Sequence, residues 1–168
     1  MSTPTPTVKK DSTLECLLFE IFAPGLVVGV IPYVISRWQF QPAFLGLEPL
    51  RWLGALMIPV GVFQHELSVV QFIKYGCVPH LPIRFLITDG VYGVTRNPMY
   101  SGVLLALFGQ ALLFGSRGLI YEGLIVGAAF LTFMMTVDEP FMKNKYGKAY
   151  EDYAKAVPGW VPRLGRKN

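Results

Sequence analysis

Charged residues are scarce in this 168-residue chain, at 15% of the total, whereas 52% of its residues are apolar. Soluble domains carry about 25% charged residues. Cysteine is scarce too, and the two cysteines lie far apart at Cys16 and Cys77, which excludes a disulfide scaffold. The composition also excludes a disordered tail and a collagen. The chain is therefore short of the polar surface that a water-soluble protein needs.

Several catalytic and metal-binding motifs are missing. The chain has two histidines, and Val69 stands where an HExxH motif starting at His65 would need its second histidine. No metal site is predicted. GxGxxG, P-loop and GxSxG motifs are also missing, so the chemistry of soluble dinucleotide-binding domains is excluded.

Four apolar runs are long enough to be considered as membrane spans, at Leu17–Ser36, Trp52–Ile73, Met99–Ser116 and Leu119–Val137. Crossing the hydrocarbon takes about 20 mostly apolar residues in a helix. The sequence predicts an all-α integral membrane protein with about four transmembrane helices. The short turn at 115–118 makes the last two a C-terminal helical hairpin.

Residues 1–13 are rich in Pro and Thr and are expected to form a disordered leader, followed by a single transmembrane domain over 14–168. The first span lacks a small-residue cleavage site, so we expect an uncleaved anchor. Four spans would place twelve of the fifteen Lys and Arg residues on one side of the membrane and three on the other. This bias predicts a multi-pass protein with cytoplasmic N- and C-termini. It also removes the main argument for a nucleic-acid partner.

Smaller features lie within the predicted spans. Gly25/Gly29 and Gly123/Gly127 are GxxxG pairs that permit close helix approach, although chance explains them equally well. His65-Glu66 is an ionisable pair within a span and so a candidate functional site, but a structural hydrogen bond between helices is the expected role.

The segment after the fourth run has the pattern of an amphipathic helix. Apolar and aromatic residues recur at three- and four-residue spacing, with lysines between them, at Phe141, Met142, Tyr146, Ala149, Tyr150 and Tyr153. Such a tail helix is expected to lie in the lipid headgroup plane. Packing against the protein itself is the alternative.

Two polar clusters lie on the predicted cytoplasmic face. In the first, Asn97-Pro98 begins a helix whose exposed amides, with Arg96, suit an anionic group. A plain helix start with a topology-setting arginine is equally compatible. The second is Asp138-Glu139 at the predicted end of the fourth span. A helix C-terminus disfavours anions, so this pair suggests a cationic or donor-rich ligand. A solvated pair at the interface is the alternative.

The ordered motifs resemble a known family. They are Asn97-Pro98-Met99-Tyr100-x-Gly102, a helical hairpin, an acidic pair with Pro140-Phe141, Tyr146-Gly147-x-x-Tyr150-x-x-Tyr153, and Val157-Pro158. Over roughly 84–162 the chain resembles the integral-membrane methyltransferases, which include isoprenylcysteine carboxyl methyltransferases and phospholipid N-methyltransferases.

The resemblance implies that residues 84–162 bind S-adenosyl-L-methionine at the cytoplasmic membrane face. The implied cofactor-binding residues are Arg84, Phe85, Leu86, Ile87, Tyr92, Asn97, Pro98, Met99, Tyr100, Gly102, Asp138 and Glu139, and the implied catalytic residues are Glu139, Asp138 and Arg96. The chemistry agrees, because carboxylates suit the ammonium and hydroxyl groups of this cofactor, and Arg96 with the helix-start amides suits its carboxylate.

The resemblance leaves the acceptor open. Asn97 replaces the histidine usual in the isoprenylcysteine branch, and 134–137 lack that branch's basic residue, whereas the tail from Tyr146 to Pro158 is closer to that branch. The predicted acceptor is lipid-like and membrane-embedded, with a phospholipid amine favoured because Asp138, Glu139 or His65 could take its proton. The alternatives are the carboxylate of a prenylated cysteine, a small thiol, or a non-enzymatic membrane protein. The sequence does not predict an oligomeric state.

Overall fold

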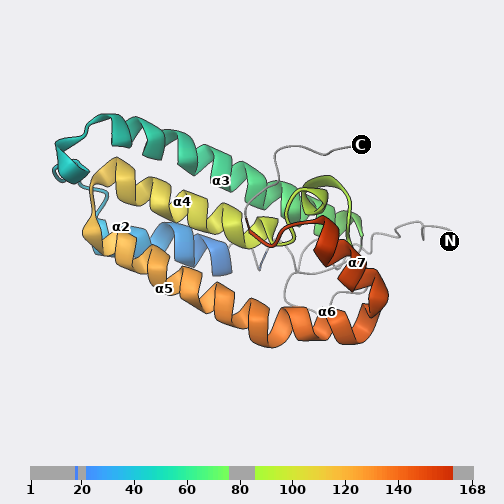
Figure 1. The fold of residues 1–168 in the computed structure, drawn as a ribbon. Coiled ribbons are helices and arrows are strands. Elements are labelled where there is room, and N and C mark those ends of the chain that lie inside the picture. Colours follow the sequence, from blue (N-terminus) through green and yellow to red (C-terminus); the bar gives the residue numbers. More distant parts are fainter. Residues whose placement is uncertain (1–17, 19–21, 76–85, 161–168) are drawn as a thin grey trace.

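The computed structural model describes residues 18, 22–75 and 86–160, and within these ranges the regular structure is entirely helical. The predicted leader and two predicted site residues, Arg84 and Phe85, lie outside the described residues. The short elements are η1 (Gly25–Val30), α2 (Ile31–Ser36), η2 (Phe44–Gly46), η3 (Gly90–Gly93) and η4 (Met134–Asp138). The longer helices are α3 (Pro49–Lys74), α4 (Pro98–Phe114), α5 (Arg117–Phe133), α6 (Glu139–Tyr146) and α7 (Lys148–Ala156), and they lie roughly along one direction until the chain turns back at α7 (Figure 1).

Two helical stretches are long and apolar enough to cross a membrane, namely Pro49–Lys74 and Arg117–Tyr146, with 26 and 30 residues. The other two predicted spans correspond to shorter apolar helices, Phe22–Ser36 and Pro98–Phe114. All four apolar runs are therefore mainly helical where the structure describes them, and two of them lie in helices of spanning length.

The fourth predicted span continues further than expected. From Arg117 the backbone stays right-handed helical through the π-turn η4 and on to Tyr146. The prediction that this helix ends at Val137 is therefore wrong, and Asp138 and Glu139 lie within a helix rather than at its C-terminus. The unfavourable interaction with a helix end, which suggested a ligand there, does not exist. The acidic pair must be judged by what it contacts.

The antiparallel helices α3 and α4 pack along much of their length, because two glycines of each helix meet two of the other. A Cβ atom on Gly54 would lie 2.5 Å from the carbonyl oxygen of Gly109, and one on Gly61 would lie 2.5 Å from that of Gly102. Real Cβ atoms do not come so close to backbone. This contact fixes α4 against α3 and so fixes where the N-terminus of α4 lies.

Two side chains of α3 hold the first turn of α4. Gln64 Nε2 donates to the carbonyl oxygen of Pro98 at 2.9 Å and to the Ser101 hydroxyl at 2.6 Å, and His65 Nδ1 lies 3.2 Å from the carbonyl oxygen of Met99. The expected hydrogen bond between helices at His65 is confirmed.

The predicted hairpin is also confirmed, since α4 ends at Gly115 in the left-handed conformation (φ +68°) and α5 begins two residues later.

The two GxxxG pairs differ from each other. A Cβ on Gly123 would meet the Phe108 ring at 2.9 Å, whereas one on Gly29 would have nothing within 4 Å. Close approach is therefore real at Gly123 and not at Gly29.

The C-terminal segment consists of two helices rather than the single amphipathic helix predicted. The helix is interrupted at Gly147 (φ +50°), between α6 and α7. Tyr150, Tyr153 and Val157 are buried in a cluster with Met142. Leu86 packs on this cluster, which supports packing of the tail against the protein. The lysines at 143, 145 and 148 are exposed. Placement of this tail in a headgroup plane stays a prediction.

Candidate functional site

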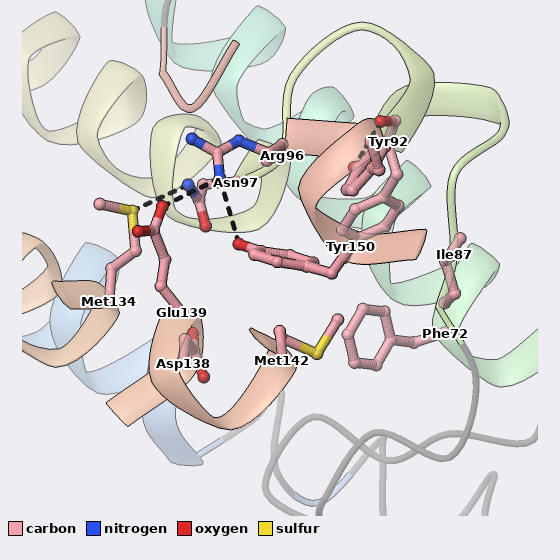
Figure 2. A pocket seen from close by; sticks show the side chains of 11 residues that line it. Phe72, Ile87, Tyr92, Arg96, Asn97, Met134, Asp138, Glu139, Met142 and Tyr150 are labelled. Atoms are coloured by element: carbon pink, nitrogen blue, oxygen red, sulfur yellow. Dashed lines mark hydrogen bonds and ion pairs between the residues drawn. The ribbon is translucent and has the colours of Figure 1, made fainter. Parts of the chain in front are cut away.

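A pocket lies where the end of α3, the segment before α4, η4 with α6, and α7 converge (Figure 2). Polar groups cover one part of its wall, and aromatic and aliphatic side chains cover the rest. It is lined by Phe72, Ile87, Tyr92, Arg96, Asn97, Met134, Asp138, Glu139, Met142, Tyr150 and Tyr153.

The centre of the polar wall is an ion pair between segments far apart in sequence. Arg96 Nη1 donates to Glu139 Oε1 at 2.9 Å and to the Tyr150 hydroxyl at 3.1 Å. The two ionic side chains are 18% and 22% exposed, so water screens this pair only partly. Lys143 Nζ lies 3.8 Å from Glu139 Oε2. Glu139 is therefore paired with two neighbouring cations, of which Arg96 is the closer.

Asp138 has a different environment. It is half-buried, its Oδ2 accepts a hydrogen bond from the Tyr100 hydroxyl at 2.9 Å, and it has no ion pair among the described residues. The Tyr100 ring stacks on Phe130 with ring centroids 4.7 Å apart, which holds the hydroxyl in place. The site thus has one carboxylate paired with cations and one that is not.

The segment 157–160, which follows α7 and is called the strap below, is tied to the chain before α4. Arg96 N donates to the carbonyl oxygen of Pro158 at 2.9 Å. The carbonyl oxygen of Gly159 accepts from Thr95 Oγ1 and from Asn97 Nδ2, both at 3.0 Å. These bonds join the Asn-Pro motif to the Val-Pro motif, which lie about 60 residues apart along the sequence.

The apolar wall depends on η3, which α3 holds in place. Gln71 Nε2 donates to the carbonyl oxygen of Asp89 at 2.7 Å, and Gln71 Oε1 accepts from Val91 N at 3.2 Å. This places Tyr92 against Phe72 and Ile87 in a buried cluster. The Tyr153 hydroxyl then donates to the carbonyl oxygen of Tyr92 at 2.7 Å, which secures α7 to η3.

Burial raises the pKa of Tyr153, and it also raises the pKa of Tyr150 although the Arg96 charge acts in the opposite direction. Both hydroxyls therefore stay protonated near neutral pH. Tyr153 can keep donating to Tyr92, and Tyr150 does not compete with Glu139 as an anion beside Arg96.

The structure brings six of the sequence-predicted site residues into this pocket: Ile87, Tyr92, Arg96, Asn97, Asp138 and Glu139. Tyr100 reaches it through Asp138, and Met99 packs behind the Phe72 and Tyr92 cluster. Leu86 packs against the cluster that contains Tyr150.

Two predicted residues have another role in the fold. Pro98 and Gly102 do not line this pocket and face α3, where Gly102 is needed for the close approach to Gly61. The sequence prediction of the site omitted five lining residues, namely Phe72, Met134, Met142, Tyr150 and Tyr153. The aromatic and apolar spacing of the tail is visible in the sequence, but it is compatible both with a membrane-facing surface and with packing against the protein.

The fold thus combines two apolar helices of membrane-spanning length with a pocket that has a polar and an aromatic wall. Comparison with known proteins identifies the family of the chain. Residues 50–149 match the family described as phospholipid methyltransferase, and the chain belongs to this family. The family and the three relatives described next are named as methyltransferases, so the resemblance found in the sequence is confirmed and the chain is a membrane methyltransferase.

Three relatives illustrate the similarity. Protein-S-isoprenylcysteine O-methyltransferase B of Arabidopsis thaliana is 29% identical over 162 residues, which cover 89% of this chain and 78% of the relative. Protein-S-isoprenylcysteine O-methyltransferase of Schizosaccharomyces pombe is 31% identical over 79 residues, covering 47% and 34%. Phosphatidylethanolamine N-methyltransferase of Malassezia globosa is 31% identical over 104 residues, covering 59% and 11%. No solved structure matches the chain.

Proposed function

We propose that the pocket binds S-adenosyl-L-methionine and that the chain transfers its methyl group to a lipid-like acceptor. When bound, this cofactor supplies an electrophilic methyl group on a positively charged sulfur. The residues present fit such a ligand, because the pocket offers carboxylates for its cationic groups, an arginine whose Nε is buried without an acceptor, and an apolar wall. The observation that carries the proposal is the joining of Arg96 and Asn97 with Asp138 and Glu139 in one pocket.

The chain's own residues would act mainly by positioning and by excluding water. Asp138 and Glu139 would attract the ammonium group and the ribose hydroxyls. Phe72, Ile87 and Tyr92 would surround the less polar part of the ligand. The strap and α7 close over the polar wall, which keeps water away from Arg96.

For the acceptor we favour a lipid amine. An ammonium group must lose a proton before its nitrogen can accept a methyl group, so the site needs a base. Asp138 is suited to this task because it lacks a cationic partner among the described residues, whereas Glu139 is paired with Arg96. The proton would move to a carboxylate oxygen of Asp138, and the Tyr100 hydroxyl would hold that carboxylate in place.

The carboxylate of a prenylated cysteine is the second candidate. It is supported by a relative that matches 89% of this chain and is named as an isoprenylcysteine O-methyltransferase. Such an acceptor is ionised at neutral pH and needs a cation rather than a base. In the pocket that cation would be Arg96, which is already paired with Glu139. Because Arg96 already has this partner, we rank the lipid amine above the carboxylate as the acceptor.

The experiment that separates the two acceptors uses purified protein, methyl-labelled S-adenosylmethionine and a membrane lipid extract or a prenylated peptide. Label that enters the lipid fraction and that mild alkali does not release as volatile methanol supports the amine. Label that mild alkali releases as volatile methanol identifies a carboxyl ester and overturns our choice. The two products differ in chemistry, so one assay distinguishes them.

We also propose that all four apolar helices cross the membrane and that both termini are cytoplasmic. The two long helices and the excess of Lys and Arg on one predicted side support this topology. A tag at either terminus should be protected from external protease in intact cells. Exposure of one terminus alone would mean an odd number of crossings.

A further inference from the structure

Only four buried side-chain polar atoms in the described part of the chain lack a hydrogen-bond partner. Two are the carboxylate oxygens of Glu122, which lies on α5 and is not a residue of the candidate site. The other two are both donors, Arg96 Nε and Trp160 Nε1. Buried donors are seldom left unpaired, because an unpaired donor loses its hydrogen bonds to water and gains none in return. Each therefore indicates an acceptor that the folded chain does not itself provide.

The two unpaired donors belong to one small region. Trp160 is the last described residue of the strap, whose Pro158 and Gly159 carbonyls accept from Arg96 N, Thr95 and Asn97. A Cβ atom on Gly159 would lie 3.3 Å from Arg96 Nη2, so the strap crosses directly over the guanidinium. The Trp160 ring lies 6.5 Å from the ring of Tyr100, whose hydroxyl donates to Asp138.

The unused edge of Arg96 is the one that binds oxyanions. Its Nη1 is occupied by Glu139 and Tyr150, and no partner occupies Nε. An arginine binds a carboxylate or a phosphate with two parallel hydrogen bonds from adjacent N–H groups. An indole N–H can only donate. A cationic donor edge and an indole donor, both buried and both unpaired, match an oxyanion.

We propose that Arg96 Nε and Trp160 Nε1 form a subsite for the carboxylate at the amino-acid end of the bound cofactor. An α-amino acid carries its ammonium and carboxylate groups on one carbon, so the groups that bind them must be neighbours. Here the Arg96 guanidinium is 2.9 Å from Glu139 Oε1, which provides that arrangement. Trp160 becomes a binding residue that the sequence motifs do not indicate. The proposal rests on the proposed cofactor.

The test compares two ligands of purified full-length protein by calorimetry. S-adenosylhomocysteine has the amino-acid end, and 5′-methylthioadenosine lacks it. Trp160→Phe keeps an aromatic ring and removes the donor, and Trp52→Phe, at a side chain that is 79% exposed on α3, is the matched control. We expect Trp160→Phe to raise the Kd of S-adenosylhomocysteine roughly tenfold or more, because the lost hydrogen bond is to a charged group. The Kd of methylthioadenosine should be unchanged.

The other outcomes contradict the proposal in distinguishable ways. Unchanged binding of S-adenosylhomocysteine by Trp160→Phe would overturn it. Equal weakening of both ligands would mean that the strap only packs around the pocket, which also overturns it. A raised KM for the lipid acceptor with unchanged cofactor binding would assign the oxyanion to a phosphate or carboxylate of the acceptor. Failure of the wild-type protein to bind either ligand would instead refute the proposed cofactor.

Discussion

Replacing Glu139 with glutamine tests the polar wall of the pocket most sharply. The substitution keeps the size of the side chain and removes the charge that faces Arg96 at 2.9 Å. An exposed ion pair contributes about 0–1 kcal/mol, and breaking a fully buried one costs about 3–5 kcal/mol. The side chains here are 18% and 22% exposed, so we expect a stability loss of about 1–2 kcal/mol, which leaves the protein folded.

The effect on ligand binding should be larger than the effect on folding. A hydrogen bond to a charged group contributes about 1.5–3 kcal/mol, so losing one to the ligand ammonium raises Kd roughly 10- to 150-fold. Calorimetry with S-adenosylhomocysteine measures this, and a thermal unfolding scan reports the fold. Glu151→Gln is the matched control, because Glu151 is exposed on α7 outside the pocket. If Glu139→Gln binds the ligand as tightly as the wild type, the assignment of this carboxylate to the site is wrong.

Three further substitutions test other parts of the account. Tyr100→Phe removes the hydroxyl that donates to Asp138 and should slow methyl transfer up to about tenfold while changing cofactor Kd less, as measured with labelled cofactor; a larger change in Kd than in turnover would contradict this role. Gly61→Ala forces a Cβ to within 2.5 Å of the Gly102 carbonyl oxygen and should cost about 1–3 kcal/mol in thermal unfolding, whereas Gly29→Ala, with open space around it, should not. Glu122→Met removes a buried carboxyl group without a partner and should raise the melting temperature; a lower one would show that Glu122 has a stabilising partner.

The sequence predicted the helices well because apolar runs of this length have few alternatives. It also located the Asn-Pro helix start and the acidic pair, whose residues meet in the pocket as Asn97, Asp138 and Glu139. It placed the end of the fourth helix wrongly, since Asp138, Glu139 and Pro140 look like an ending. Pro140 lies in the first turn of α6, where its ring is tolerated, and the π-turn η4 carries the helix into it.

The features of the fold and site that the sequence did not predict depend on contacts between segments distant in sequence. Phe72 looked like the end of an apolar span, and nothing local indicates that it packs on Tyr92. The glycines that determine the α3–α4 contact, Gly54 and Gly61, have a seven-residue spacing that the GxxxG pattern does not capture. Tyr153 illustrates the same limit, because its amphipathic spacing predicts burial without saying whether lipid or protein covers it. The structure shows protein at its hydroxyl.

The central claim is that methyl-donor binding takes place in the pocket formed by the segment before α4 and by η4 with α6 and α7. Ultraviolet cross-linking of methyl-labelled S-adenosylmethionine to the purified protein, followed by peptide mapping, tests it most directly. We expect label in peptides covering residues 86–100 or 134–160, and its loss when S-adenosylhomocysteine is in excess. Displaceable label confined to residues 49–67 of α3, or label that S-adenosylhomocysteine does not displace, would contradict it.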